Sequence, residues 1–311
     1  MKILITGGTG LVGSAIKDIS ILYPNYTFIF IGSKDCDLLN YNKTLKYFKN
    51  IQPEYVIHLA GNVGGLYKNM NYKVEMFEDN ILINLNVIKA SYHINVKKLI
   101  SCLSTCIFPD NISYPINENV LHNGPPHYSN DTYAYAKRML EIQSNAYNQQ
   151  YGTNFVTIIP TNVYGPNDNF NILDGHIIPA LIHKCYIAKN TNTIFNIAGT
   201  GKPLRQFIYS EDLAKLIMWC LESYNEKTPI ILSNDDKDEI SIGEIATLIA
   251  NEFNYNDYLN FDETKQDGQF KKTADNSKLR SLNPNFEFTN IKDGLKKTIE
   301  WFISNYDNCR K

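Results

Sequence analysis

The chain predicts an α/β fold: a Rossmann-type doubly wound parallel sheet with a smaller C-terminal α/β substrate domain. Over the first half of the 311 residues, short apolar runs alternate with amphipathic helical stretches, which is typical of a parallel sheet covered on both faces. A glycine-rich loop directly follows the first apolar run, where such folds bind a dinucleotide. We expect a dinucleotide-binding domain at 1–165, to which 204–222 returns, and a mainly substrate-binding domain at 166–311.

The first β–α unit consists of an apolar strand at residues 2–6 and a helix that ends near Leu22. Between them the glycines follow a G-x-x-G-x-x-G spacing. Glycine lets the backbone turn tightly and approach a pyrophosphate, which then lies at the N-terminus of the helix. An ordinary glycine-rich turn is the alternative interpretation. The cofactor contacts expected in this loop are Gly7, Gly8, Thr9, Gly10, Leu11, Val12 and Gly13.

The end of the second strand, residues 27–31, decides between the two nicotinamide dinucleotides. An NAD site places an acidic residue there, which hydrogen-bonds the ribose 2′-hydroxyl. This chain has Ser33 and Lys34 after a glycine, and these side chains suit a 2′-phosphate that a carboxylate would repel. The pattern favours NADP, and Asp35 leaves NAD open if its side chain turns inward. Asp37 and Leu38 are expected to meet the edge of the adenine.

Two further β–α units continue the alternation. We expect a helix over 43–50, a buried strand over 55–59, a helix over 75–93 and a strand over 98–103. A pair of glycines, Gly64 and Gly65, lies past the carboxyl end of the strand at 55–59. Two adjacent glycines suit either close approach to a ligand in the crevice of the sheet or a plain tight turn.

Residues 104–130 contain four prolines and no periodic pattern, and a loop of this length in a compact domain is typical of a functional edge. Ser104 begins the loop, and Tyr133 and Lys137 open the helix that follows, 134–150, one turn apart on one face. A phenol has an ordinary pKa near ~10, and an ammonium one turn away is expected to lower it. The three side chains together indicate reduction of a carbonyl group with a redox cofactor.

The second half of the chain is less regular. A turn-rich run at 160–166 follows the strand at 155–159 and predicts the exit from the first domain. The remaining expected elements are a helix over 177–188, a strand over 193–197, an extended segment over 205–209, helices over 212–224 and 242–253 with a strand over 229–232 between them, a polar loop at 267–272 and a helix over 293–305.

Composition excludes several classes of partner. The 30 basic and 32 acidic residues give a net charge of −2 without a block of like charge, so neither nucleic acid nor an anionic membrane is expected as a partner. No apolar run approaches the ~20 residues of a membrane span, and the strand at the N-terminus leaves no room for a signal peptide. The six cysteines form neither metal-ligand pairs nor a disulfide framework, which predicts a cytoplasmic protein without a metal.

In their order along the chain, the glycine loop, Ser104 and Tyr133-x-x-x-Lys137 resemble the extended short-chain dehydrogenase/reductase superfamily that acts on nucleotide sugars. Longer stretches are similar to one family within it, the bifunctional GDP-4-keto-6-deoxy-D-mannose 3,5-epimerase/4-reductases. These stretches are SCLSTCIFP (101–109), NGPPH (123–127), PTNVYGPNDNF (160–170), GHIIP (175–179) and DGQFKK (267–272). The resemblance covers essentially the whole chain. It implies NADPH-dependent conversion of GDP-4-keto-6-deoxy-D-mannose to GDP-L-fucose, and a homodimer formed through the helices 75–93 and 131–150.

The resemblance also assigns roles to residues. It gives the reduction to Ser104, Tyr133 and Lys137, and the epimerisation to Cys106 and His176 as acid and base. Besides the glycine loop, the implied NADP contacts are Ser33, Lys34, Lys137, Pro160, Thr161, Asn162, Val163 and His176. The implied substrate contacts are Asn162, Lys184, Arg205 and Asp267. Some relatives carry arginine at 184, whose bidentate fork a lysine lacks.

The chemistry of a 4-keto sugar suits these residue types. The ketone acidifies the C3 and C5 protons, and a thiol (pKa ~8.5) and an imidazole (pKa ~6.5) exchange protons near neutrality. Ser104 is expected to hold O4 as charge develops there, and Tyr133 to give O4 a proton after hydride transfer to C4. The competing interpretation makes Cys106 a buried apolar residue and His176 a structural histidine. His58 is expected in the core, and Tyr135 is expected to point away from the site.

Two other functions compete with this one. A nucleotide-sugar 4-epimerase or 4,6-dehydratase on the same scaffold would retain NAD, and the dehydratase would carry an Asp-Glu pair where Thr105 and Cys106 stand. A non-catalytic, NADP-sensing binding protein would tolerate the loss of Ser104, Tyr133 or Lys137, and all three are present. Net consumption of NADPH separates these alternatives.

Overall fold

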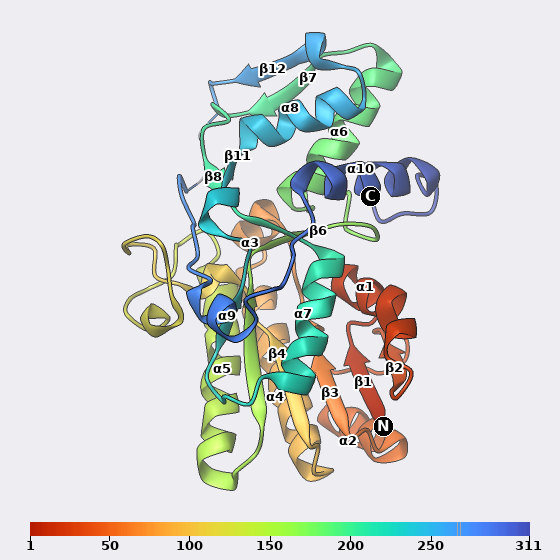
Figure 1. Cartoon of the computed structure of the whole chain (residues 1–311), viewed down its shortest axis with the longest axis vertical. Coiled ribbons are helices and arrows are strands. Elements are labelled where there is room, and N and C mark those ends of the chain that lie inside the picture. Colours follow the sequence, from red (N-terminus) through yellow and green to blue (C-terminus); the bar gives the residue numbers. More distant parts are fainter. Residues whose placement is uncertain (266, 268) are drawn as a thin grey trace.

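The structure is a computed structural model that describes residues 1–265, 267 and 269–311. Its first unit contains a six-stranded sheet (Figure 1). Its strand order is β10-β5-β4-β3-β1-β2, and all neighbours are parallel. The predicted doubly wound fold is therefore confirmed. The strands are β1 (Lys2–Thr6), β2 (Thr27–Ile31), β3 (Tyr55–His58), β4 (Lys98–Cys102), β5 (Phe155–Pro160) and β10 (Ile230–Leu232).

Strand β1 lies at the point where the strand order reverses. It pairs with β2 on one edge and with β3 on the other, in registers that align Thr6 with both Ile31 and His58. Connections from neighbouring strands leave in opposite directions at such a point, so the carboxyl ends of β1 and β3 border an open crevice. The glycine loop and the segment after β3 both begin there.

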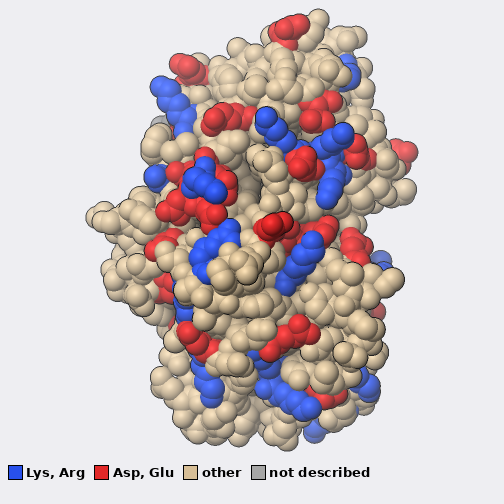
Figure 2. Space-filling model, viewed as in Figure 1, with Lys and Arg blue, Asp and Glu red and all other residues tan. Residues whose placement is uncertain are grey.

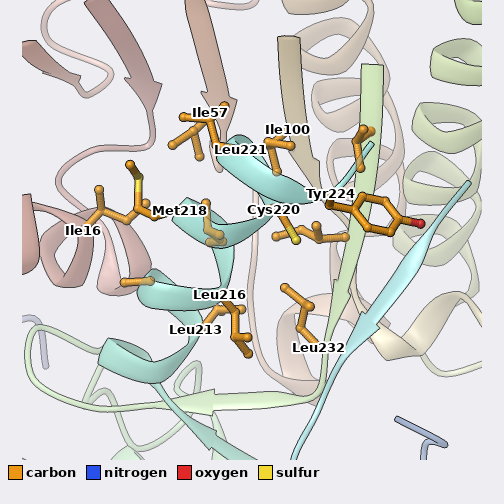
Figure 3. Packing of buried hydrophobic residues seen from close by; sticks show 14 of the residues in the cluster. Ile16, Ile57, Ile100, Leu213, Leu216, Met218, Cys220, Leu221, Tyr224 and Leu232 are labelled. Carbon is orange, nitrogen blue, oxygen red and sulfur yellow. The ribbon is translucent and has the colours of Figure 1, made fainter. Parts of the chain in front are cut away.

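Helices cover both faces of this sheet, and the strands are apolar on both sides for that reason. The α1 (Leu11–Ile19) and α7 (Ser210–Ser223) helices cover one face, and α2 (Tyr41–Ile51), α4 (Lys73–His93) and α5 (Asp131–Tyr151) cover the other. Residues alternate accordingly: Ile3 and Ile5 join the first core and Leu4 joins the second. Figure 3 shows Ile57 and Ile100 of the sheet packed against side chains of α7.

The second unit has its own core. It contains α6 (Ile177–Thr191), β7 (Phe195–Ala198), α8 (Ile242–Glu252), β12 (Leu259–Asp262) and α10 (Ile291–Ser304), which lie at the top of Figure 1. Strands β7 and β12 pair in parallel. Buried aromatic side chains such as Phe170 and Phe302, whose ring centres lie 4.5 Å apart, fill the space between the helices.

Two short strand pairs connect the units and correct two expectations. The run at 160–166 is not simply a turn, because β6 (Asn162–Tyr164) pairs with β9 (Phe207–Tyr209). The segment at 205–209 is not one strand either, since β8 (Leu204–Arg205) pairs instead with β11 (Ile240–Ser241). The break lies at Gln206, whose buried side-chain amide hydrogen-bonds the backbone of Asn234 and Ala274.

Several short elements were not expected from the sequence. They are α3 (Leu66–Asn71), α9 (Ser277–Leu282), β11, β12 and one-turn 3-10 helices at 105–107, 118–120, 236–238 and 256–258. Such pieces are too short to show a hydrophobic period. The 3-10 helix at 105–107 lies inside the loop 104–130 and carries Cys106. Within the similar stretch 267–272, residue 268 lies outside the described residues.

On the face drawn in Figure 2, basic and acidic side chains are interspersed. Across residues 1–265, 267 and 269–311, no helix combines the length and the apolar character that crossing a bilayer requires.

Candidate active site

The glycine loop forms a tight turn between β1 and α1. Gly7 has a φ of +71°, which favours glycine, and the backbone N–H of Gly8 donates to the Ile31 carbonyl at 2.8 Å. A Cβ on Gly13 would lie 2.5 Å from the Gly7 oxygen, so a side chain at that position would force the loop apart. Gly10 precedes α1 without a side-chain cap. The first amides of α1 therefore border the crevice, as a pyrophosphate site requires.

The end of β2 presents Ser33 and Lys34, which are both exposed. The neighbouring carboxylate of Asp35 accepts a hydrogen bond from the Gly32 N–H at 2.8 Å, so Asp35 closes its own turn. Asp37 pairs with Lys43 at 3.2 Å, and Leu38 packs against the core beneath α4. Ser33, Lys34 and Asp35 are all exposed. The Asp35 carboxylate is bound to its own turn, and the Ser33 hydroxyl and the Lys34 ammonium offer the chemistry that a 2′-phosphate prefers.

His58, at the end of β3, is the expected core histidine. Its Nδ1 lies 2.7 Å from the Thr6 hydroxyl and its Nε2 lies 3.1 Å from the Asn84 side-chain oxygen. Burial lowers the pKa of His58 to about 3, so the ring is neutral. Both nitrogens have partners, and the prediction of a satisfied core residue is confirmed.

Tyr133 and Lys137 lie on the first turns of α5 and are almost completely buried, at 7% and 3% exposure. The Lys137 ammonium donates to the Cys102 carbonyl at 2.9 Å and lies 5.9 Å from the centre of the Tyr133 ring. Its Nζ would also lie 3.5 Å from a Cβ on Gly61, which follows β3. Lys137 therefore bridges the carboxyl ends of β3 and β4 beside the glycine loop.

The expected effect of Lys137 on Tyr133 is wrong for this structure. Burial raises the pKa of Tyr133 well above its ordinary value, and the nearby thiols of Cys106 and Cys102 add to the increase. Burial also lowers the pKa of Lys137. The ammonium is directed to a backbone carbonyl and desolvation dominates, so Tyr133 is a protonated phenol at neutral pH. A phenol in that state is a proton donor.

Ser104 and Cys106 follow β4 on a tight turn. The Ser104 hydroxyl accepts a hydrogen bond from the Cys106 N–H at 3.5 Å and caps the 3-10 helix at 105–107. Cys106 is partly exposed, at a small pocket that is also lined by Asp110, His127 and Lys272. Burial raises the pKa of the Cys106 thiol, and the Ser104 hydroxyl, Lys272 and Lys137 oppose that increase. The thiol is therefore not an enclosed core residue.

His176 comes from the second unit. It precedes the first residue of α6 and is exposed. The loop before it is held by the Asn171 side-chain oxygen, which accepts from the N–H groups of Leu173 and Asp174. The Asp174 carbonyl in turn accepts from the Gly65 N–H at 2.9 Å. The glycine pair after β3 thus receives a loop of the second unit at close range, which brings the His176 loop to the crevice.

Asp168 is a residue of this loop that sequence reasoning missed. It is 4% exposed, one carboxylate oxygen accepts from the Asn169 N–H at 2.7 Å, and the other has no hydrogen-bond partner within the described part of the chain. Burial raises the pKa of Asp168 to about 6, and the charge of His176 opposes the increase. The signal in the sequence was the polar run Asn167-Asp168-Asn169 just ahead of the histidine.

The expected substrate residues lie on both units. Arg205 donates to the carbonyls of Leu204 and Gln269, each at 2.7 Å. Asp267 holds Thr200 through its N–H and its hydroxyl, at 2.9 and 2.6 Å. Asn162 donates to the Gln206 carbonyl at 2.9 Å, and Lys184 is partly exposed on α6.

Lys272 is a second residue without an expected role. Burial lowers its pKa, the Cys106 thiolate opposes that shift and Arg205 adds to it. Lys272 lines the same small pocket as Cys106. Of the remaining candidates, Tyr135 is 39% exposed and points away, as expected, and His183 binds the Phe170 carbonyl in the core of the second unit.

The chain is similar to known proteins over almost its whole length. The NAD dependent epimerase/dehydratase family matches residues 3–233. A GDP-L-fucose synthase of Dictyostelium discoideum is 52% identical in an alignment of 311 positions that covers 99% of this chain and 97% of that protein. A probable GDP-L-fucose synthase of Drosophila melanogaster is 45% identical, with coverage of 100% and 99%. The crystal structure of a GDP-L-fucose synthetase from Naegleria fowleri bound to NADP superposes with a TM-score of 0.96 at 47% identity, covering 100% of this chain and 95% of that one.

Proposed function

The chain belongs to the NAD dependent epimerase/dehydratase family, and we propose that it converts GDP-4-keto-6-deoxy-D-mannose to GDP-L-fucose with NADPH. One observation carries this function beyond the family as a whole. The Cys106 thiol lies two residues after Ser104, at a turn that also meets Tyr133 and Lys137, so groups for proton exchange and for ketone reduction share one site. The similarity to GDP-L-fucose synthases over almost the whole chain supports the same assignment.

The residues present fit NADP. Backbone and β-carbon atoms lie where a Cβ on Gly8 or Gly13 would stand, and such close packing brings the loop amides to a pyrophosphate. Gly7–Gly13 would hold the pyrophosphate, Ser33 and Lys34 the 2′-phosphate, and Asp37 and Leu38 the adenine. Lys137, Pro160–Val163 and His176 would hold the nicotinamide end. When bound, NADPH supplies the hydride for C4.

The epimerisation uses Cys106 and His176. The ketone at C4 acidifies the neighbouring C–H bonds, and one group removes a proton from C3 or C5 while the other returns a proton to the opposite face. Negative charge then collects on O4, where the Ser104 hydroxyl and the Tyr133 phenol donate hydrogen bonds. The buried cation of Lys137 stabilises this charge further.

The reduction uses Tyr133 as the proton donor. Because burial keeps the phenol protonated, its proton is available to O4 when C4 is reduced. Lys137 stabilises the resulting phenolate, since the ammonium lies above the same ring. Ser104 keeps O4 in place through both reactions.

Substrate incubation tests this function directly. With GDP-4-keto-6-deoxy-D-mannose and NADPH in D₂O, we expect net oxidation of NADPH, deuterium at C3 and C5, and GDP-L-fucose as the product. Turnover without net NADPH oxidation would instead support the 4-epimerase or dehydratase alternative. NADP binding without any turnover would support a sensing protein.

We further propose a homodimer formed through α4 and α5. These two helices pack side by side, and they expose large apolar side chains toward solvent, among them Val74, Phe77, Leu82, Leu85, Met139 and Ile142. A second copy would cover this surface. Light scattering at micromolar concentration tests it, and a monomer contradicts it. We also place the protein in the cytoplasm, a reducing compartment that suits its six free thiols.

A further inference from the structure

We propose that Arg138 is a positioning residue for the Cys106 thiol: its guanidinium ties the turn that carries Cys106 to α5, the helix that carries Tyr133 and Lys137. This role rests on the proposed epimerisation at Cys106. The adjacent residues then differ in role: Lys137 acts at O4 in both reactions, whereas Arg138 acts in the epimerisation alone.

The contacts of Arg138 join three pieces of backbone. Its side chain is 5% exposed. The Nε donates to the carbonyl of Ile107, the last residue of the 3-10 helix that contains Cys106, and one Nη donates to the Gly124 carbonyl at 2.7 Å. Gly124 lies in the distal arm of the loop 104–130. One guanidinium therefore fixes both arms of this loop to α5.

An arginine is suited to this task. Its planar guanidinium offers donors in a fixed fork and keeps its charge when buried. The loop has little regular structure, so its position depends on bonds from side chains more than on a ladder of backbone bonds. One backbone bond, from the Asp110 N–H to the Pro125 carbonyl at 3.0 Å, also joins the two arms. The ring of Tyr135 lies 5.6 Å from the guanidinium and helps to fix its plane.

The positive charge of Arg138 also interacts with the Cys106 thiol. Burial lowers the pKa of Arg138, and the Cys106 thiolate acts in the opposite direction. The charged and titratable groups that face Cys106 are Lys137, Arg138 and Tyr133 from α5, Lys272 from the second unit, and Asp110 and His127 from the loop itself. Three of these are cations that favour a thiolate, so loss of Arg138 both loosens the turn and removes one of them.

Geometry separates Arg138 from Lys137. Successive residues of an α-helix point about 100° apart, and the two side chains accordingly reach different partners. Lys137 donates to Cys102 at the end of β4, whereas Arg138 donates to Ile107 beyond Cys106. A change at Arg138 should therefore disturb the thiol more than the phenol.

The test uses Arg138→Met and Arg138→Lys in the full-length protein, with Lys98→Met as a matched control. Lys98 is also a buried cation bonded to carbonyls, because its Nζ donates to Cys220, Leu221 and Tyr224 at the end of α7. It lies at the start of β4, away from the site. Three quantities are measured: deuterium entry at C3 and C5 in the presence of NADP⁺, the fraction of reduced sugar that has not been epimerised, and the rate of Cys106 alkylation by iodoacetamide across pH, read by mass spectrometry.

In Arg138→Met we expect deuterium entry to fall about 10-fold to 100-fold, the loss typical of a misplaced catalytic group. The unepimerised fraction of the product should rise, and the alkylation profile should move to higher pH. Arg138→Lys keeps the charge and loses the fork, so it should lose about 10-fold in deuterium entry with an alkylation profile near that of the wild type. Lys98→Met should lower the melting temperature and leave the product ratio and the alkylation profile unchanged.

The outcomes separate this role from the proposed function. Absence of deuterium entry in the wild type overturns the proposed epimerisation itself. Normal exchange in the wild type, together with unchanged exchange and alkylation in Arg138→Met, overturns the positioning role alone. If Arg138→Met does not fold, Arg138→Lys decides: exchange equal to that of the wild type overturns the role, and a selective loss supports it.

Discussion

Tyr133 and Lys137 stand on the first two turns of a 21-residue α-helix, whereas Cys106 and His176 stand at the edges of irregular segments. Cys106 lies in a 3-10 helix of three residues, and His176 precedes the first residue of α6 after a loop held by asparagine side chains. Tyr133 and Lys137 are 7% and 3% exposed, while Ser104, Cys106 and His176 are partly or fully exposed. The site thus combines two side chains held by a long helix with two side chains held by short, irregular segments.

The difference follows from what each reaction requires. Protonation of O4 must be aligned with hydride delivery at one carbon, and a phenol fixed by a helix supplies that alignment. Epimerisation exchanges protons at two carbons on both faces of the ring, so its groups must approach from separate walls. Hydrogen bonds that the Arg138 side chain donates and the Asn171 side chain accepts hold these loops in place. Separate supports predict that each reaction can be damaged without the other.

The largest expected effect is that of Tyr133→Phe. Removal of the proton donor should lower the reduction by about 10³-fold, while deuterium entry at C3 and C5 falls much less because Ser104 still holds O4. The ratio of NADPH oxidation to solvent exchange measures this. Tyr135→Phe is the matched control and should be unchanged, since the Tyr135 side chain is exposed and the ring that packs on Arg138 is kept. Equal loss of both reactions in Tyr133→Phe would contradict the separation of supports.

Cys106→Ser should give the opposite pattern. An alcohol is a far weaker acid than a thiol, so deuterium entry at C3 and C5 should fall by about 10²-fold. Direct reduction of the unepimerised ketone should persist, because Tyr133 and Lys137 are untouched. Cys309→Ser, at a partly buried thiol in the C-terminal segment, serves as the control. Undiminished deuterium uptake in Cys106→Ser would remove Cys106 from its proposed role.

Gly13→Ala should affect the reduction through the cofactor. The new methyl group would lie 2.5 Å from the Gly7 oxygen and 2.6 Å from the Gly8 Cα, so the loop must shift away from the pyrophosphate. We expect the KM for NADPH to rise by about 10-fold to 100-fold, with solvent exchange largely kept. Gly152→Ala controls for general stability, because Gly152 has a φ of +68° and open space around it at the end of α5. An unchanged KM in Gly13→Ala would show that the loop tolerates the shift.

The smallest effect concerns stability and lies in the His176 loop. The folded protein binds the Asp168 proton more tightly than the unfolded chain, since burial raises the pKa of Asp168 to about 6 from an ordinary value near ~4. The stability contributed by this group is therefore complete below pH ~4 and is lost as the pH rises to about 6. Asp168→Asn keeps the acceptor for the Asn169 N–H and should stabilise the protein by about 2 kcal/mol at pH 7.5, but not at pH 4.

Urea unfolding of both proteins at the two pH values measures this difference. In both proteins, His58 adds a pH dependence of stability that is opposite in sign to that of Asp168. Its folded pKa of about 3 makes the free energy of unfolding fall as the pH drops below ~6.5. The difference between wild type and Asp168→Asn removes that background. A gain that is equal at pH 4 and pH 7.5 would exclude titration of Asp168 as its cause.

Sequence reasoning found the regular parts of the molecule because their patterns are local. The periods of two and 3.6 residues predicted β1 and β2 to the residue, and the helix of Tyr133 and Lys137 to within three residues. The same reasoning reversed the direction of the Tyr133 pKa, since spacing along a helix does not reveal burial or the carbonyl that receives the Lys137 ammonium. Local spacing predicts which side chains share a face, and tertiary packing decides their electrostatics.

The missed residues depend on contacts between distant parts of the chain. Gln206 divides the expected strand at 205–209 through bonds to Asn234 and Ala274. Lys272 comes near Cys106 from more than 160 positions away in the sequence. No role for Arg138 was predicted, because its partners lie in a loop without any period. No repeating pattern in the sequence predicts such contacts.

The late return of the chain to its first sheet has a consequence for biosynthesis. When residue 165 leaves the ribosome, the sheet face formed by Ile3, Ile5, Ile57 and Ile100 still lacks α7, and the edge of β5 still lacks β10. Both arrive only with residues 210–232, after α6 and β7 have been translated. The nascent chain therefore exposes an apolar sheet face while about 67 more residues are added. During that interval it depends on chaperones more than a protein whose first domain is continuous in sequence.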